Sequence, residues 1–112
     1  MKFTTSLKKN HEFRRLYNKG KSAASQYIVI YVRKNNSIGN RLGITVSKKI
    51  GSAVQRNRVR RRLKEIYRLC ETDLKPGYDI VIVARVSSRF IKYSELETSV
   101  LLLLKKLGIL CK

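Results

Sequence analysis

Histidine and acidic residues are scarce in this chain of 112 residues, which has one histidine, His11, and seven Asp or Glu. The acidic residues are scattered along the chain without paired spacing. Hydrolytic sites built by protein alone need clustered carboxylates that hold metal ions, or a histidine that works with an acidic or basic partner. Gly39, Gly43 and Gly51 also lack the spacing of a phosphate-binding loop. We therefore predict that the protein alone forms no catalytic site and no metal site.

Cysteines and long apolar runs are also rare. Cys70 and Cys111 are the two cysteines, too few for a disulfide framework and without partners at metal-ligand spacing. We expect two reduced thiols, with Cys70 near the core. No segment reaches the roughly 18 apolar residues of a membrane span, and no apolar run follows Met1 and Lys2 as in a secretory signal. The sequence thus predicts a cytoplasmic protein without a membrane partner.

Positive charge is abundant, because 26 Lys and Arg leave a formal net charge of +19. Such an excess attracts polyanions and predicts fast, salt-sensitive association with phosphate-rich partners. A disordered basic tail would carry similar charge, but 43% of the residues are hydrophobic and they form periodic segments. We therefore expect one folded domain over residues 1–112.

The charge is concentrated in residues 48–68, which read KKIGSAVQRNRVRRRLKEIYR. Val59, Leu63 and Ile66 follow helical spacing and form one narrow apolar stripe that can dock on a core. Ser52 and Gln55 stand in a capping-box relation and predict where this helix begins. The arginines are left to face solvent or a partner, and their planar guanidinium groups suit phosphate contacts. The predicted partner is nucleic acid.

The other periodic segments predict an α+β domain in which helices cover a small sheet. A turn at residues 35–40 indicates that the first two strands form a hairpin. One face of the second strand carries Arg41, Gly43, Thr45 and Ser47, and we expect that face of the sheet to be accessible. The expected elements are a helix at 10–19 capped by Asn10 and ended by Gly20, a possible short strand at 21–25, strands at 26–34, 41–47 and 79–86, and a final helix introduced by a capping box at 94–97 and ended by Gly108.

Three aromatic residues form a second candidate site. Phe13 and Tyr17 share a face of the first predicted helix, and Tyr31 lies on the strand face opposite the aliphatic positions. They could simply pack helix against sheet, or they could line a groove in which single-stranded bases stack. The pattern alone leaves both interpretations open.

Residues 42–65, LGITVSKKIGSAVQRNRVRRRLKE, resemble the signature of the bacterial ribonuclease P protein subunit, whose RNR motif is matched by Arg56, Asn57 and Arg58. The N-terminal LKKNHEFRRLYNKG and the later DIVIVAR are also similar to that family. The resemblance implies an α-β-β-β-α-β-α fold with a central four-stranded sheet, flanked by helices, and a left-handed β-α-β crossover, contrary to the usual right-handed rule.

The resemblance also implies a function. The family's protein is a subunit of a ribozyme, an endoribonuclease that removes the 5′ leader from precursor tRNA. Its partners are the catalytic RNA and the leader, and no small-molecule cofactor is implied. The RNA carries the active site and binds most of the Mg²⁺, so the protein alone is not expected to be catalytic.

Two sets of site residues follow from the resemblance. One set would contact the catalytic RNA, with Asn57 bonding either backbone groups or RNA, and the other would line the cleft that binds the leader. The first comprises Lys48, Lys49, Arg56, Asn57, Arg58, Arg60, Arg61, Arg62, Lys64 and Arg68, and the second comprises Phe13, Tyr17, Tyr31 and Ser47.

Two other classes share the same charge. A ribosomal or general RNA-binding protein would bind RNA without promoting leader cleavage. A DNA-binding module would place the basic helix in a major groove, but the arginines face too many directions for readout of a few bases. Neither class would stimulate cleavage of a precursor tRNA by a catalytic RNA.

Overall fold

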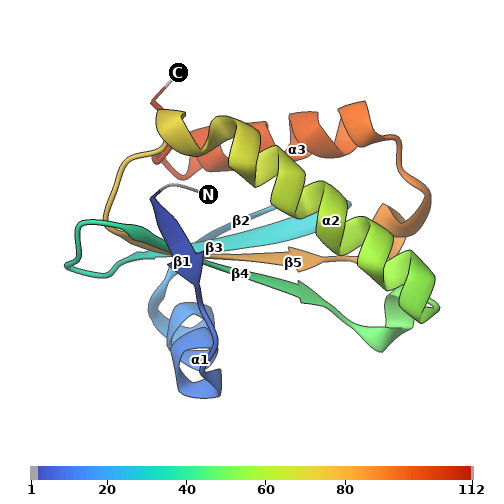
Figure 1. Ribbon diagram of the computed structural model, residues 1–112, viewed down its shortest axis with the longest axis horizontal. Coiled ribbons are helices and arrows are strands. Elements are labelled where there is room, and N and C mark those ends of the chain that lie inside the picture. Colours follow the sequence, from blue (N-terminus) through green and yellow to red (C-terminus); the bar gives the residue numbers. More distant parts are fainter. Residues whose placement is uncertain (1–2, 112) are drawn as a thin grey trace.

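A computed structural model describes residues 3–111 as a five-stranded sheet with helices on both faces (Figure 1). The α+β class is as predicted. The elements in chain order are β1 (Thr4–Ser6), α1 (Asn10–Lys19), β2 (Lys21–Ala24), β3 (Ile28–Lys34), β4 (Asn40–Val46), η1 (Lys48–Ile50), α2 (Ala53–Cys70), η2 (Glu71–Asp73), β5 (Tyr78–Ala84), η3 (Val86–Phe90) and α3 (Tyr93–Lys106), where η marks a short 3-10 helix.

The strand order is β1-β4-β5-β3-β2. The hairpin predicted for β3 and β4 is wrong, because β5 lies between them, antiparallel to β3 and parallel to β4. The apolar run of β5 explains this position, since Ile80, Val81 and Ile82 are fully buried and belong at the centre of a sheet. The possible strand at 21–25 is confirmed as β2. The expected count of four strands was one too low, because the short polar β1 pairs with β4.

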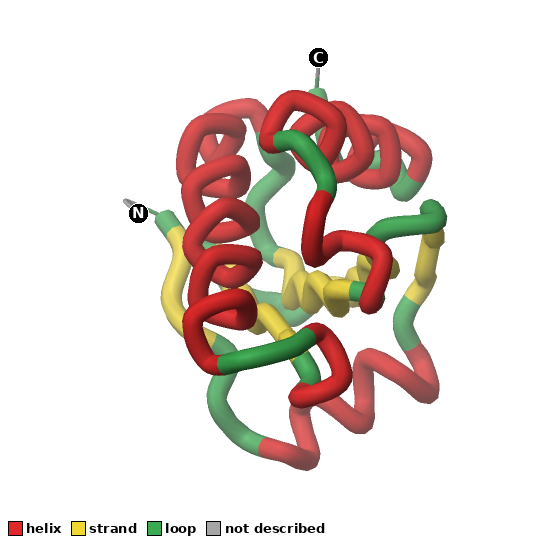
Figure 2. Tube along the Cα trace, turned by 90° about the vertical axis from the view of Figure 1, so that its right-hand side faces the viewer, coloured by secondary structure: helices red, strands yellow, loops and turns green. Residues whose placement is uncertain are grey.

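Helices α2 and α3 cover one face of the sheet, and α1 covers part of the other (Figure 2). The larger core lies under α2 and α3, while the smaller core comprises Leu7, Leu16 and Val81. Helix α2 forms the crossover between the adjacent parallel strands β4 and β5. The left-handed sense of this crossover stays a prediction from the family resemblance.

The capping box at the start of α2 is confirmed, because the backbone N–H of Gln55 donates to Ser52 Oγ and that of Ser52 to Gln55 Oε1. The predicted box at 94–97 is wrong. Helix α3 begins at Tyr93 after the N-cap residue Lys92, and no side chain caps it. The half-buried Tyr93, the first residue of α3, packs against the core.

The first helix ends at the predicted residue but is capped differently at its start. Lys9, not Asn10, is the N-cap residue of α1, and no side chain caps it. Gly20 does end α1, because a Cβ there would lie 2.6 Å from the Leu16 carbonyl oxygen and 2.9 Å from that of Val32. At the end of α3, Gly108 has a φ of 79°, the left-handed conformation expected of a glycine after a helix.

Candidate nucleic-acid interface

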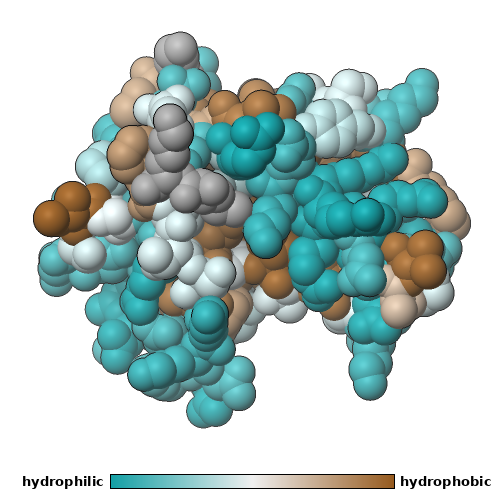
Figure 3. All heavy atoms as spheres, in the orientation of Figure 1, coloured by the Kyte–Doolittle hydropathy of each residue, from teal (hydrophilic) through white to brown (hydrophobic). Residues whose placement is uncertain are grey.

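Helix α2 is positioned by its apolar stripe, since Val59, Leu63, Ile66 and Tyr67 are at most 2% exposed. Its remaining faces carry the positive charge. Figure 3 shows hydrophilic side chains gathered over α2 on the face turned to the viewer. Of the predicted RNA-contacting residues, those that lie exposed are Lys48 and Lys49 in η1 and Asn57, Arg58, Arg60, Arg61, Lys64 and Arg68 in α2.

Two of the predicted cations have partners within the protein. Arg62 is half-buried and donates from an Nη atom to the Ile91 carbonyl oxygen at 3.0 Å, which ties η3 to α2. Arg68 makes two hydrogen bonds with the Glu65 carboxylate, at 2.6 and 3.0 Å. This contact lowers the pKa of Glu65 and raises that of Arg68. Both arginines therefore have structural contacts that sequence spacing did not reveal.

The first two residues of the RNR motif, Arg56 and Asn57, also differ from one another. Asn57 is exposed, and its Oδ1 accepts a hydrogen bond from Arg60 at 3.3 Å. Arg56 is half-buried, and within the described residues its Nε is buried without a hydrogen-bond partner. Arg60 and Lys64 lie on one flank of α2, above β1 and β4, whereas Arg62 points to the opposite flank.

The second candidate site lies where α1 crosses β4. The side chains of α1 meet the outward face of β4 at three successive positions. Glu12 forms an ion pair with Arg41, the Phe13 ring lies on Gly43, and the hydroxyls of Tyr17 and Thr45 are 3.4 Å apart. A Cβ at Gly43 would lie 2.6 Å from two carbons of the Phe13 ring, so this close approach depends on glycine.

The three predicted aromatics come together here. The rings of Tyr17 and Tyr31 meet edge to face with centroids 4.9 Å apart, and those of Phe13 and Tyr17 are 6.5 Å apart. Phe13 and Tyr31 are half-buried and pack against the smaller core, whereas Tyr17 is 40% exposed. Both interpretations of the sequence therefore describe part of the cluster, since two rings pack and one stays open.

Two hollows adjoin these rings. One, of about 400 Å³, is lined by Asn10, Phe13, Arg14, Tyr17 and Thr45, and we call it the aromatic groove. The other, also about 400 Å³, lies between β1, β4 and α2. Its lining comprises Thr4, Thr5, Ser6, Leu7, Phe13, Leu42, Gly43, Ile44, Arg60 and Lys64. Phe13 thus separates the aromatic groove from two cations of α2.

Some of these lining residues were not predicted, and one predicted residue lies elsewhere. Arg14 and Thr45 line the aromatic groove but were absent from the predicted site. The alternation along β4 could have indicated Thr45, which shares a face with Gly43. Ser47 is exposed just after β4 and is not part of the groove lining.

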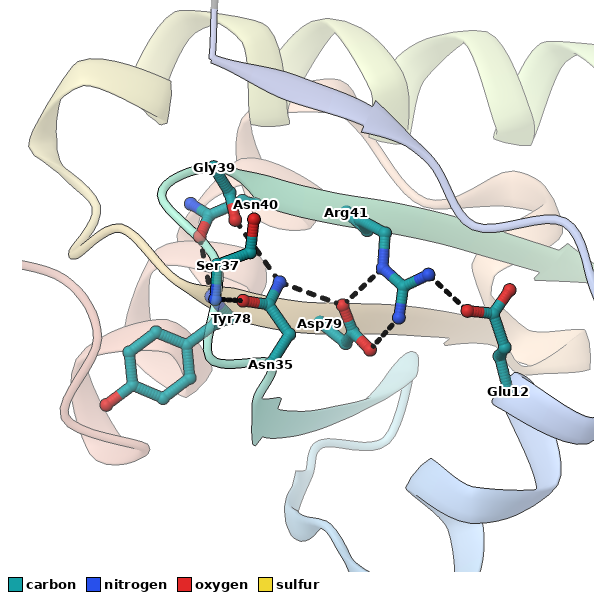
Figure 4. A network of polar contacts seen from close by, with 8 residues as sticks. All are labelled: Glu12, Asn35, Ser37, Gly39, Asn40, Arg41, Tyr78 and Asp79. Atoms are coloured by element: carbon teal, nitrogen blue, oxygen red, sulfur yellow. Dashed lines mark hydrogen bonds and ion pairs between the residues drawn. The ribbon is translucent and has the colours of Figure 1, made fainter.

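A polar network joins α1 to the starts of β4 and β5 (Figure 4). The guanidinium group of Arg41 donates two hydrogen bonds to Asp79, at 2.8 and 2.7 Å, and a third to Glu12. Asn35 donates to the same Asp79 at 3.0 Å. These carboxylates raise the pKa of Arg41, chiefly through its hydrogen bonds with Asp79. The network joins α1, β4, β5 and the loop before β4.

Reactive groups are few among residues 3–111. No three His, Cys, Asp or Glu side chains in that range come together as metal ligands. Both cysteines are free, with Cys70 buried and Cys111 exposed, and burial raises the pKa of the Cys70 thiol to about 11. No helix within the described part is long and apolar enough to cross a membrane.

Comparison with known proteins decides the family. A family model described as Ribonuclease P matches residues 1–108. The ribonuclease P protein component of Clostridioides difficile (strain 630) is 50% identical over 107 residues, which cover 95% of this chain and 94% of that relative. This chain belongs to the ribonuclease P protein family.

Solved structures of ribonuclease P proteins share the fold. The Staphylococcus aureus RNase P protein has a TM-score of 0.87 and 33% identity, covering 94% of this chain and 96% of that chain. The Thermotoga maritima RNase P protein has a TM-score of 0.82 and 31% identity, covering 90% and 96%. As a ribonuclease P protein, the chain assists the RNA subunit of an endoribonuclease that matures the 5′ end of tRNA.

Proposed function

We propose that this protein binds its two RNA partners on separate surfaces, ribonuclease P RNA on the exposed flanks of α2 and the single-stranded 5′ leader of precursor tRNA in the aromatic groove. The observation that best supports leader binding in the aromatic groove is the position of Tyr17. Its ring is braced edge-on by Tyr31 and is still 40% exposed inside a hollow.

The charge distribution supports the role of α2. Glu65 forms an ion pair with Arg68, and no other acidic residue occurs in α2. Like charges at helical neighbour positions repel by a few tenths of a kcal/mol each, and a bound polyanion removes that cost. Phosphates of the catalytic RNA would bind Arg58, Arg60, Arg61 and Lys64, with Lys48 and Lys49 beside the start of the helix.

The chemistry of the groove supports the leader assignment. Bases of a single strand stack on aromatic rings without demanding a particular sequence, which suits a groove that accepts an unpaired leader. Arg14 lies beside Phe13 and Tyr17 in the groove lining and would meet the leader phosphates. Arg60 and Lys64 line the adjoining hollow, so a leader in the aromatic groove would lie close to the RNA-binding cations of α2. Mature tRNA lacks the leader and would not occupy this groove.

Mg²⁺ would be held chiefly by the RNA subunit, where it supplies the metal-assisted hydrolysis of the phosphodiester. The role of this protein would be to bind the leader and the catalytic RNA and to orient them. Its cations would lower the repulsion between leader and catalytic RNA, so that less Mg²⁺ is needed for substrate binding. We place this activity in the cytoplasm, where tRNA precursors meet the processing ribonucleoprotein.

The leader assignment can be tested with Tyr17→Ala in a holoenzyme reconstituted with ribonuclease P RNA. Loss of one stacking ring should weaken the binding of precursor tRNA about five- to 150-fold, while mature tRNA binds as before. Because Tyr17 is exposed, the variant should keep its fold, which thermal unfolding can check.

Tyr17→Phe is the matched control, since it keeps the ring and loses only the long contact with the Thr45 hydroxyl. It should bind precursor tRNA nearly as the native protein does. An equal loss of precursor and mature tRNA binding by Tyr17→Ala would show that the groove does not bind the leader.

A further inference from the structure

Phe90, the last residue of η3, is 75% exposed, more than Phe3 at 60% or Tyr17 at 40%. It is the most exposed aromatic side chain among residues 3–111. A phenyl ring so exposed to water contributes little to folding, and aromatic rings are enriched on surfaces that a partner covers. The surroundings of this ring indicate which partner that is.

The segment that carries Phe90 is braced on several sides, so its exposure is a fixed feature of the fold. The backbone N–H of Arg85 donates to the Tyr27 carbonyl oxygen at 2.9 Å, and Ser87 Oγ donates to that of Gln26. On the other side, Arg62 of α2 donates to the Ile91 carbonyl oxygen. The ring therefore stands on a preorganised support, which lowers the entropic cost of binding.

One face of the Phe90 ring is already occupied. The guanidinium carbon of Arg89 lies 4.5 Å from the ring centroid, a cation–π contact. Arg89 is held there by a hydrogen bond of 3.2 Å from an Nη atom to the Ile50 carbonyl oxygen of η1. Since the ring is nevertheless 75% exposed, its other face is free to accept a flat group.

The surroundings are positively charged throughout. Lys48 and Lys49 belong to η1, which contacts η3. Arg58 lies one helical turn from Arg62, so it shares the flank of α2 that is tied to η3. No Asp or Glu occurs in residues 47–64 or 80–94, which include both of these 3-10 helices. A flat, apolar group that is part of a polyanion fits this setting, and a nucleobase is such a group.

We propose that Phe90, backed by Arg89, is a stacking platform for one unpaired base of ribonuclease P RNA. The strand that carries this base would continue onto the cations of α2, so the proposal rests on the RNA-binding role proposed for that helix. It adds a base contact on the η3 side of α2, away from the aromatic groove under the other face of the sheet.

The chain contains no tryptophan, so Phe90→Trp introduces a single tryptophan at the platform, which can be excited selectively over the six tyrosines. Titration with ribonuclease P RNA should quench its emission as a base stacks on the indole ring, and the affinity should equal or exceed that of the native protein. Phe3→Trp is the matched control, an exposed aromatic position without a cation–π partner in the described residues, and its emission should change little.

Phe90→Ala should weaken RNA binding about five- to 150-fold and leave the slope of log affinity against log salt unchanged, because no charge is removed. Unaltered affinity in Phe90→Ala would overturn the platform, whether or not Phe90→Trp is quenched, since a base near the ring would then contribute nothing. Variants that remove α2 cations distinguish a failure of the Phe90 platform from a failure of the proposed RNA-binding role of α2. If those variants still weaken RNA binding, only the platform fails.

Discussion

The two faces of the sheet hold their helices in different ways. Helix α2 shares the large core with α3 and the sheet, and its exposed cations point away from that core. Helix α1 is held by the smaller core, by the Arg41 network and by Phe13, whose ring also lines the aromatic groove. On α2, stability and contact with RNA therefore depend on different residues. On α1 both depend on Phe13.

The largest effect should come from neutralising α2. The triple variant Arg58→Gln, Arg60→Gln, Arg61→Gln removes three exposed charges and keeps Arg62, which anchors η3. Each lost phosphate contact on a single strand lowers the log–log salt slope by about 0.7, so the slope should fall by about 2. The free energy of unfolding should hold or rise, because like charges no longer repel. Filter binding across salt concentrations and urea unfolding measure the two effects.

Lys105→Gln with Lys106→Gln is the control for net charge, since both residues lie in the last turn of α3. This pair should change the slope much less than the α2 triple. Equal changes in slope would mean that total charge, and not the α2 surface, governs RNA binding. A large loss of stability in the triple variant would contradict the separation of stability from RNA contact on α2.

The sequence was informative about α2, whose signals are local, although the local capping signals at Asn10 and at residues 94–97 are not used in the structure. The capping box of Ser52 and Gln55 and the stripe of Val59 and Leu63 define α2 through neighbours within a turn or two. The strand order could not be obtained in this way, because it depends on β5 entering between two strands that are close in sequence. Strand β1 has three polar residues and carries no periodic signal.

The same limit applies to the site. Helical spacing correctly predicted that most cations of α2 are exposed. The structural role of Arg62 could not be predicted in this way, because it depends on the Ile91 carbonyl group, 29 residues away. The proximity of Phe13, Tyr17 and Tyr31 could be predicted, because the sequence pattern shows which face of a helix and of a strand each residue occupies. The contact of Phe13 with Gly43 could not be predicted, because it depends on where α1 packs on the sheet.

A smaller effect should follow from Gly43→Ala, which tests whether stability and binding are coupled on the α1 side. The new Cβ would overlap the Phe13 ring and displace it. Overpacking of this kind costs about 1–3 kcal/mol, and the displaced ring should also weaken precursor tRNA binding but not mature tRNA binding. Urea unfolding and paired affinity measurements on the reconstituted holoenzyme would show both losses.

The double variant Gly43→Ala with Phe13→Leu separates the two roles of the ring. Leucine leaves room for the added methyl group, so part of the stability should return. Leader-dependent affinity should stay low, because the aromatic ring is gone. Recovery of precursor tRNA binding in the double variant would show that Phe13 acts in packing alone.

The smallest effect concerns the buried side of α2. Burial raises the pKa of the Cys70 thiol to about 11, above its ordinary value near 9. Below pH 9 the thiol is protonated in both folded and unfolded chains, and its contribution to stability is fully present. As the pH rises from 9 toward 11, the unfolded chain ionises first, so stability should fall across that window. Thermal unfolding between pH 8 and pH 10.5 would measure the decline.

Cys70→Ala isolates this contribution, because Tyr67 on the same helix is also buried and has a raised pKa with the same direction of pH dependence. The variant should be less stable at pH 8 because of the lost side-chain volume, yet its stability should fall less steeply between pH 9 and pH 10.5. Equal slopes in the two proteins would mean that water reaches the Cys70 thiol. The inner face of α2 would then be less completely buried than the contrast with α1 requires.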